Sequence, residues 1–130
     1  MRGDEARVVN AFCAYLQNEG WDVEREVKFV DVKATKGTLT LYAEAKGRTE
    51  AIGLDVDALY GQLLRRVPDD AEDSILGVVV PERAVDAALR VPEWIRACLR
   101  VRIWAVSDDG QVRQVAPALS LIIEVRLGTA

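Results

Sequence analysis

Histidine is absent from the 130 residues of this chain. Its absence excludes a Ser-His catalytic triad, histidine-containing zinc sites and the nucleases that depend on histidine. Cysteine occurs twice, as Cys13 and Cys98, which lie far apart and lack any metal-ligand spacing. We expect both to be small buried thiols and not a disulfide. Any catalysis must therefore use carboxylates, lysine and a metal ion.

Long apolar runs are also missing. No stretch of about 18 apolar residues is present, as a membrane-spanning helix would need. The chain has no signal-like start, in which a positive segment precedes a long apolar stretch. We therefore expect a cytoplasmic protein without a membrane partner. With 130 residues, half of them hydrophobic, the chain can build one core, so residues 1–130 are expected to form one domain.

Positive charge is scarce relative to negative charge. The chain has 17 Lys and Arg against 21 Asp and Glu, which gives a net charge of −4. Because a protein that binds a nucleic-acid duplex usually has a basic surface, this balance is the chief objection to such a partner. A small basic cleft on an acidic body would answer the objection. The basic residues nearest the site considered next are Lys28, Lys33, Lys36, Lys46, Arg48, Arg65 and Arg66.

Two carboxylates and an ammonium are predicted to meet on adjoining strands. Asp31 is followed thirteen positions later by Glu44, within the run Leu-Tyr-Ala-Glu-Ala-Lys-Gly. Side chains alternate between the faces of a strand, so Glu44 and Lys46 share one face while Ala43 and Ala45 take the other. The pattern therefore predicts a compact polar group on one face of a hairpin.

The turn of this hairpin has two arrangements that suit its glycine. A two-residue loop can be Gly37-Thr38, with glycine first, or Lys36-Gly37, with glycine second. The first sets Asp31 directly opposite Glu44, with Cβ atoms roughly 5 Å apart, and the second sets it diagonal to Glu44. Both registers put all three polar side chains on one face.

A close pair of carboxylates needs a proton or a cation, because like charges repel and both lose hydration. Mg²⁺ binds oxygen ligands, typically one or two carboxylates together with water and substrate phosphate. Lys46 would then lie beside the attacking water or the scissile phosphate, where its charge would orient the nucleophile and stabilise the transition state. The alternative is that Asp31, Glu44 and Lys46 form an ordinary solvated face.

The arrangement resembles the PD-(D/E)xK superfamily, the restriction-endonuclease-like nucleases that include Holliday-junction resolvases and many repair and defence enzymes. In that family a helix with a glutamate precedes a strand with the Asp and a strand with Glu-x-Lys, and a helix with a glutamine follows. The resemblance covers about residues 4–80. The residue before Asp31 is Val30, so the proline that names the motif is absent. The matched positions are Glu5, Asp31, Glu44, Lys46 and Gln62.

The resemblance implies a DNA endonuclease that uses Mg²⁺ or Mn²⁺ to hydrolyse phosphodiester bonds. It also implies a restriction-endonuclease-like core. The implied roles are metal binding by Asp31, Glu44 and the Ala45 carbonyl, activation of water by Lys46, and assistance from Glu5 and Gln62.

Glu5 is predicted to head the buried stripe of a helix over about residues 4–19. Counting back one turn from Val8 and Val9 places it there. A carboxylate at this position could reach the metal or its bound water. Alternatively, Glu5 only favours the positive end of the helix dipole, with Asp4 as cap.

Gln62 is predicted on a second helix, over residues 54–67, with Asp55 as its cap. It lies at the border of the apolar stripe, beside Arg65 and Arg66. The family resemblance gives the glutamine a role in holding substrate or water, and the two arginines could hold phosphate. The alternative is that these side chains are solvated, as polar residues at the border of a helix usually are.

The remaining segments predict a single-domain α/β fold, with a mixed central β-sheet flanked by helices. Residues 21–34 contain no Gly or Pro, so a long bent strand or a bulge is expected there. The core would span about residues 4–80, supported by residues 81–130. The further predicted elements are strands over 75–80, 101–106, 111–115 and 119–127, helices over 82–89 and 92–99, and a hairpin turn over 107–110.

Three functions fit these features, and they differ in partner. The first is the metal-dependent nuclease acting on DNA. The second is a catalytically silent module with the nuclease fold, which binds or assembles in a repair or defence system. The third is a hydrolase of small phosphate esters. A homodimer that presents two sites is attractive for so short a chain, with residues 119–127 as the contact. Trp94 and Trp104 are expected in the core or at such a contact.

Overall fold

The computed structural model describes residues 3–27, 30–47 and 50–118. The predicted strand over residues 119–127, and the dimer contact assigned to it, lie outside these residues, as do Lys28 and Arg48. The elements are α1 (Gly3–Asn18), β1 (Asp22–Val27), β2 (Val30–Lys36), β3 (Leu39–Ala45), α2 (Ile52–Arg66), β4 (Ile75–Pro81), η1 (Glu82–Ala84), α3 (Val85–Ala88), α4 (Glu93–Leu99), β5 (Val101–Val106) and β6 (Val112–Ala116).

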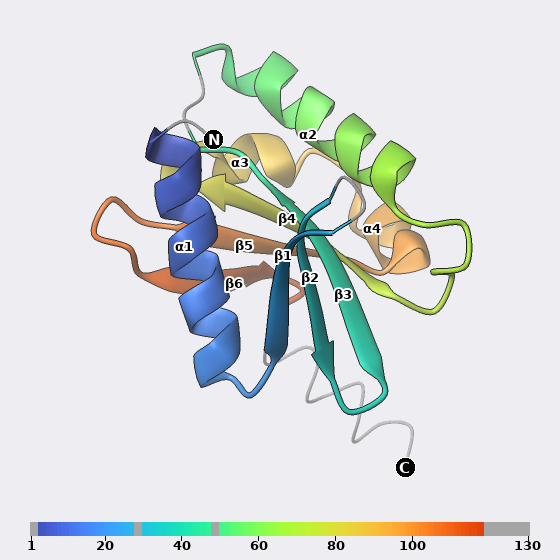
Figure 1. Cartoon of the computed structure of the whole chain (residues 1–130). Coiled ribbons are helices and arrows are strands. Elements are labelled where there is room, and N and C mark those ends of the chain that lie inside the picture. The colour runs from blue at the N-terminus through green and yellow to red at the C-terminus, as the bar shows by residue number, and fades with distance from the viewer. Residues whose placement is uncertain (1–2, 28–29, 48–49, 119–130) are drawn as a thin grey trace.

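A six-stranded mixed sheet forms the centre of the molecule, and its strands are ordered β1 to β6 as in the sequence (Figure 1). β1, β2 and β3 pair antiparallel, β3, β4 and β5 pair parallel, and β6 returns antiparallel to β5. The predicted α/β class, with a mixed sheet flanked by helices, is confirmed. No helix in the described parts of the chain is long and apolar enough to cross a membrane.

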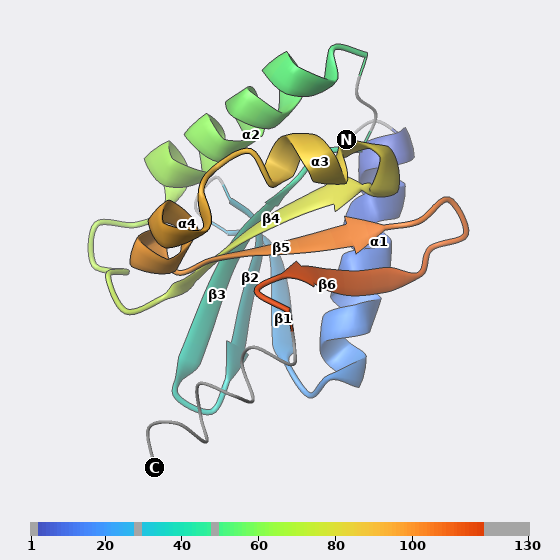
Figure 2. The same ribbon diagram turned by 180° about the vertical axis from the view of Figure 1, so that it is seen from behind.

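The helices divide between the two faces of the sheet. α2 connects β3 to β4, whereas α3 and α4 connect β4 to β5, and both connections step in the same direction across the sheet. Because crossovers between parallel strands are right-handed in nearly all proteins, both connections come to lie on one face. α1 covers the opposite face, as Figure 1 and Figure 2 show from the two sides.

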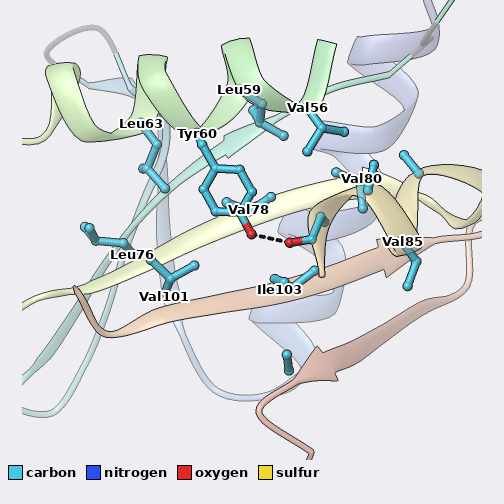
Figure 3. Close-up of a cluster of buried hydrophobic side chains, with 14 of the residues drawn as sticks. Val56, Leu59, Tyr60, Leu63, Leu76, Val78, Val80, Val85, Val101 and Ile103 are labelled. Carbon is cyan, nitrogen blue, oxygen red and sulfur yellow. Dashed lines mark hydrogen bonds between the residues drawn. The ribbon is translucent and has the colours of Figure 1, made fainter. Parts of the chain in front are cut away.

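Two buried clusters lie on the two faces. Beneath α1, Phe12 packs against Trp104 with ring centroids 5.0 Å apart. On the other face, Leu59 of α2 packs into a cluster that includes Val78 and Ile103 (Figure 3). β4 lies between the clusters and is buried along its whole length, which explains its continuous apolar run.

Tyr60 ties α2 to the crossover that follows β4. Its hydroxyl donates a hydrogen bond to the Ala88 carbonyl at 2.6 Å, inside the cluster (Figure 3). Burial of the phenol raises the pKa of Tyr60 to about 12, so the hydroxyl stays protonated and remains a donor. This bond joins α2 to α3 on the face of the sheet that both helices cover.

The β2–β3 hairpin adopts the register with glycine first in its loop. Lys36 pairs with Leu39 and Val32 pairs with Ala43, so the loop is Gly37-Thr38. Gly37 has φ +60°, which a glycine adopts without steric cost at the first position of a type II′ turn. The same pairing, continued by one residue, sets Asp31 opposite Glu44.

The segment over residues 21–34 was expected to be one bent or bulged strand, and this prediction is wrong. β1 and β2 are separate strands that pair antiparallel, from Asp22 with Thr35 to Val27 with Val30. Glu26 adopts φ +52°, a conformation that usually requires glycine. Residues 21–34 contain no Gly or Pro to mark a turn, so the hairpin escaped prediction.

Smaller corrections concern the helix ends and two surface residues. The N-cap of α2 is Ala51, and Asp55 instead accepts a hydrogen bond from the Ala51 N–H at 3.1 Å. Cys98 is exposed and Trp94 is 69% exposed, because α4 has no buried residue. Trp104 lies in the core as expected.

Gly47 marks the closest approach between the sheet and α1. A Cβ placed on Gly47 would lie 2.3 Å from the backbone nitrogen of Glu5 and 2.5 Å from the Asp4 carbonyl carbon. Only a residue without a side chain allows the chain leaving β3 to touch the first turn of α1. The contact holds Glu5 beside the end of β3.

Replacing Gly47 with Ala should therefore destabilise the protein. The added methyl meets backbone atoms, so α1 must shift, and we expect a loss of about 1–3 kcal/mol in the free energy of unfolding. Gly61→Ala is the matched control, because a Cβ there meets nothing within 4 Å and alanine favours a helix by up to about 1 kcal/mol. Chemical denaturation of both variants checks this; equal stabilities would contradict the contact.

Candidate active site

Asp31 and Glu44 face each other where β2 and β3 separate. Backbone pairing between β2 and β3 runs from the turn as far as Val32 and Ala43. One residue further on, the Asp31 Oδ2 atom accepts a hydrogen bond from the Ala45 N–H at 2.9 Å. The carboxylate thus takes the place of a backbone acceptor, and the two strands part with Asp31 between them.

Glu44 is the buried member of the pair. It is 1% exposed and is the one charged residue classed as buried in the described part of the chain. Burial, a hydrogen bond with Asp31 and the negative charge of Asp31 raise the pKa of Glu44 from 4.5 to about 8. Arg66 acts in the opposite direction. Even beside Arg66, this carboxyl therefore holds a proton at neutral pH unless a further cation binds.

Arg66, the last residue of α2, reaches this carboxylate from the covering helix. Its Nη1 atom lies 3.2 Å from the Glu44 Oε1 atom. The Glu44 side chain is 2% exposed and the Arg66 side chain 40% exposed. The sequence predicted Arg66 as a phosphate ligand and gave no sign of its pairing with Glu44.

Lys46 lies one residue beyond β3 and is half-buried. Its N–H donates to the Val79 carbonyl at 3.0 Å, which continues the β3–β4 ladder. Strand alternation therefore still applies, and Lys46 shares the face of Glu44 while Gly47 faces α1. Asp31 meets Glu44 from the neighbouring strand, and the joint role of Asp31, Glu44 and Lys46 stays a prediction.

Glu5 is half-buried in the first turn of α1. The contact of its backbone with Gly47 places it next to the residue that follows Lys46. In residues 3–27, 30–47 and 50–118, no group of three or more Asp, Glu or Cys side chains is placed to hold one metal ion. Glu5 therefore does not complete a third carboxylate ligand, and its assisting role stays a prediction.

Gln62 and Arg65 are placed differently on α2. Gln62 is half-buried and lies one turn before Arg66, so both side chains are on the same stripe of the helix. Arg65 is exposed, and its Nε donates to the Gly61 carbonyl of its own helix at 3.3 Å. Gln62 therefore lies on the stripe of α2 from which Arg66 reaches Glu44, whereas the Arg65 side chain bonds to its own helix.

The oxygen atoms at this position fit a hard divalent cation. The N–H and C=O of one residue in a strand point to the same edge. Because the Ala45 N–H points at Asp31, its carbonyl lies on that edge too. Two carboxylates and a carbonyl, with water and substrate oxygen, suit Mg²⁺ or Mn²⁺. The predicted ligands Asp31, Glu44 and Ala45 are therefore compatible with such an ion.

Two solved structures resemble this fold. One is an XisH family protein from Nostoc punctiforme PCC 73102, with a TM-score of 0.58, 16% identity, and coverage of 84% of this chain and 98% of that chain. The other is an FdxN element excision controlling factor protein from Anabaena variabilis, with a TM-score of 0.58, 17% identity, and coverage of 84% and 97%. Such identities establish a shared fold alone. No protein-family model matches the chain, and no curated protein matches it.

The raised pKa of Glu44 predicts a pH dependence of stability in metal-free buffer. The folded protein holds this proton more tightly than the unfolded chain does. The resulting stabilisation is complete below pH 4.5 and is lost as the pH rises through about 8. Glu44→Gln should remove this fall, because the amide does not titrate.

Thermal unfolding in EDTA, followed from acid to mildly alkaline pH, measures the effect. Asp70→Asn, at an exposed carboxylate, serves as the control and should keep the pH profile of the unaltered protein. Identical profiles for Glu44→Gln and the unaltered protein would contradict the assignment.

Proposed function

We propose that this protein is a divalent-metal-dependent endonuclease of the PD-(D/E)xK superfamily, and that it hydrolyses phosphodiester bonds in DNA. The observation that carries this proposal is the buried carboxylate of Glu44 opposite Asp31. A buried charge beside a like charge opposes folding, and an apolar residue would pack there at lower cost. Strongly perturbed carboxyl groups of this kind concentrate at functional sites.

Each residue of the candidate site would have a separate role in such a reaction. Asp31, Glu44 and the Ala45 carbonyl would hold Mg²⁺ or Mn²⁺, which supplies Lewis-acid polarisation of the phosphate and a more acidic bound water. Lys46 holds a fixed positive charge on the same face, where it orients the attacking water and stabilises the negative charge that develops on phosphate oxygens. Glu5 and Gln62 assist from the two flanking helices.

DNA as the partner has two supports. Arg66 places positive charge beside the carboxylate pair, and Arg65 adds an exposed charge on the same helix end. The Anabaena variabilis protein with this fold is described as a factor that controls excision of the fdxN element. This description supports a nucleic-acid partner in preference to a small phosphate ester.

Lys46→Ala should lower the rate of DNA cleavage by about 10²–10³-fold with little change in fold, because it removes one transition-state stabiliser. Asp31→Ala should abolish both metal binding and cleavage. Incubation with branched, nicked and linear DNA plus Mg²⁺ or Mn²⁺ measures these rates. Lys36→Ala is the matched control, because its Nζ contacts the Glu19 carbonyl far from the site. An unchanged rate of cleavage in Lys46→Ala would contradict the proposed mechanism.

The second candidate is a catalytically silent module of the same fold. Two observations favour it: the fold neighbour is described as a controlling factor, and Arg66 already compensates the charge of Glu44. Calorimetric titration separates the two. The nuclease should bind Mg²⁺ or Mn²⁺ and lose that binding in Asp31→Ala. Absence of binding, even with nucleic acid present, would establish the module instead.

A further inference from the structure

Arg66 and Glu44 form an ion pair whose two members differ in accessibility. The carboxylate is almost completely buried, whereas two fifths of the guanidinium side chain is exposed. Arg66 also ends α2, where the backbone turns out of the helix at Val67. The pair therefore consists of a buried carboxyl group in the sheet and a cation that reaches in from the surface.

The Arg66–Glu44 contact has less favourable hydrogen-bond geometry than the Arg113–Glu82 ion pair of the same protein. Arg113 and Glu82 form two parallel hydrogen bonds, from Nε and Nη2, both at 2.9 Å. Arg66 gives Glu44 a single bond, from Nη1, at 3.2 Å. Bidentate pairs are stronger and more rigid than single contacts. Beyond this bond and its hydrogen bond with Asp31, Glu44 keeps acceptor capacity for another partner.

The charges around Glu44 identify Arg66 as the contact that another cation would replace. Asp31 lies across the strand pair and adds negative charge, so Arg66 is the positive charge that offsets it. A divalent cation between Asp31 and Glu44 would supply two positive charges at closer range. The ion would then repel Arg66 and would offset the negative charge of Glu44 in its place.

We propose that Arg66 is a stand-in cation: it holds Glu44 in the metal-free protein and is displaced from Glu44 when a divalent metal binds the carboxylate pair. The proposal rests on the metal binding assigned above. Displacement frees the guanidinium at the end of α2, beside the site, where it can meet a phosphate group. Arg66 thus acts as a positioning residue with two alternative anionic partners.

A double-mutant cycle in EDTA tests the first half. Arg66→Ala should lower the melting temperature by on the order of 5 °C, because a buried carboxylate loses its partner. In a Glu44→Gln background the same substitution should cost almost nothing. Arg65→Ala, one residue away on the exposed side, is the control and should leave the melting temperature nearly unchanged. Arg66→Lys should restore part of the loss. Equal effects of Arg66→Ala in both backgrounds would overturn the proposal.

Saturating Mg²⁺ tests the exchange. The destabilisation by Arg66→Ala should shrink to that of Arg65→Ala, and linkage then requires Mg²⁺ to bind Arg66→Ala about tenfold more tightly than the unaltered protein. Calorimetry measures the affinity. An unchanged or weakened affinity in Arg66→Ala overturns the exchange while leaving the metal site intact. Absence of Mg²⁺ binding in every variant overturns the exchange together with the proposed metal-dependent function.

Discussion

The two-residue loop Gly37-Thr38 fixes the pairing of β2 with β3, and both the core beneath α1 and the carboxylate pair depend on that pairing. With Lys36 opposite Leu39, the alternation of side chains sends Val32 and Ala43 to the α1 face. Glu44 lies on the other face, and Asp31 meets it from the neighbouring strand. A slip by one residue would exchange the two sets and bury polar groups under α1. Selection for a packed core therefore also holds the site in register.

Much of this arrangement could be predicted because it follows from short-range rules. Glycine limits the hairpin to two registers, strand alternation sorts the polar side chains, and the apolar run of β4 identifies a central strand. The features that escaped prediction depend on contacts between distant segments or on conformations without a residue signature. Residues 21–34 hold no Gly or Pro to signal the turn of the β1–β2 hairpin. Arg66 meets Glu44 only because α2 crosses back over the sheet, and no local pattern encodes that meeting.

The buried carboxylate also shows how one position can serve two states of a protein. In the absence of metal, its cost is reduced by a hydrogen bond with Asp31 and by the guanidinium of Arg66. Neither contact fills all the acceptor capacity of the carboxylate. A residue chosen only for stability would be apolar here, like the other buried residues of β3. The Tyr60–Ala88 bond and the surrounding cluster hold α2, and with it Arg66, in place beside this carboxylate.

Among the strands that the structure describes, the sequential order leaves β1 and β6 as the two edges of the sheet, and their side chains differ. Four of the six residues of β1 are charged and exposed: Asp22, Glu24, Arg25 and Glu26. Charge along an edge strand opposes the addition of a foreign strand, and the irregular backbone at Glu26 interrupts the row of free hydrogen-bonding groups. β6 carries one charged residue, Arg113, which is held by Glu82. The hairpin that presents Asp31 to Glu44 on its inner side therefore also protects the sheet, on its outer side, from aggregation.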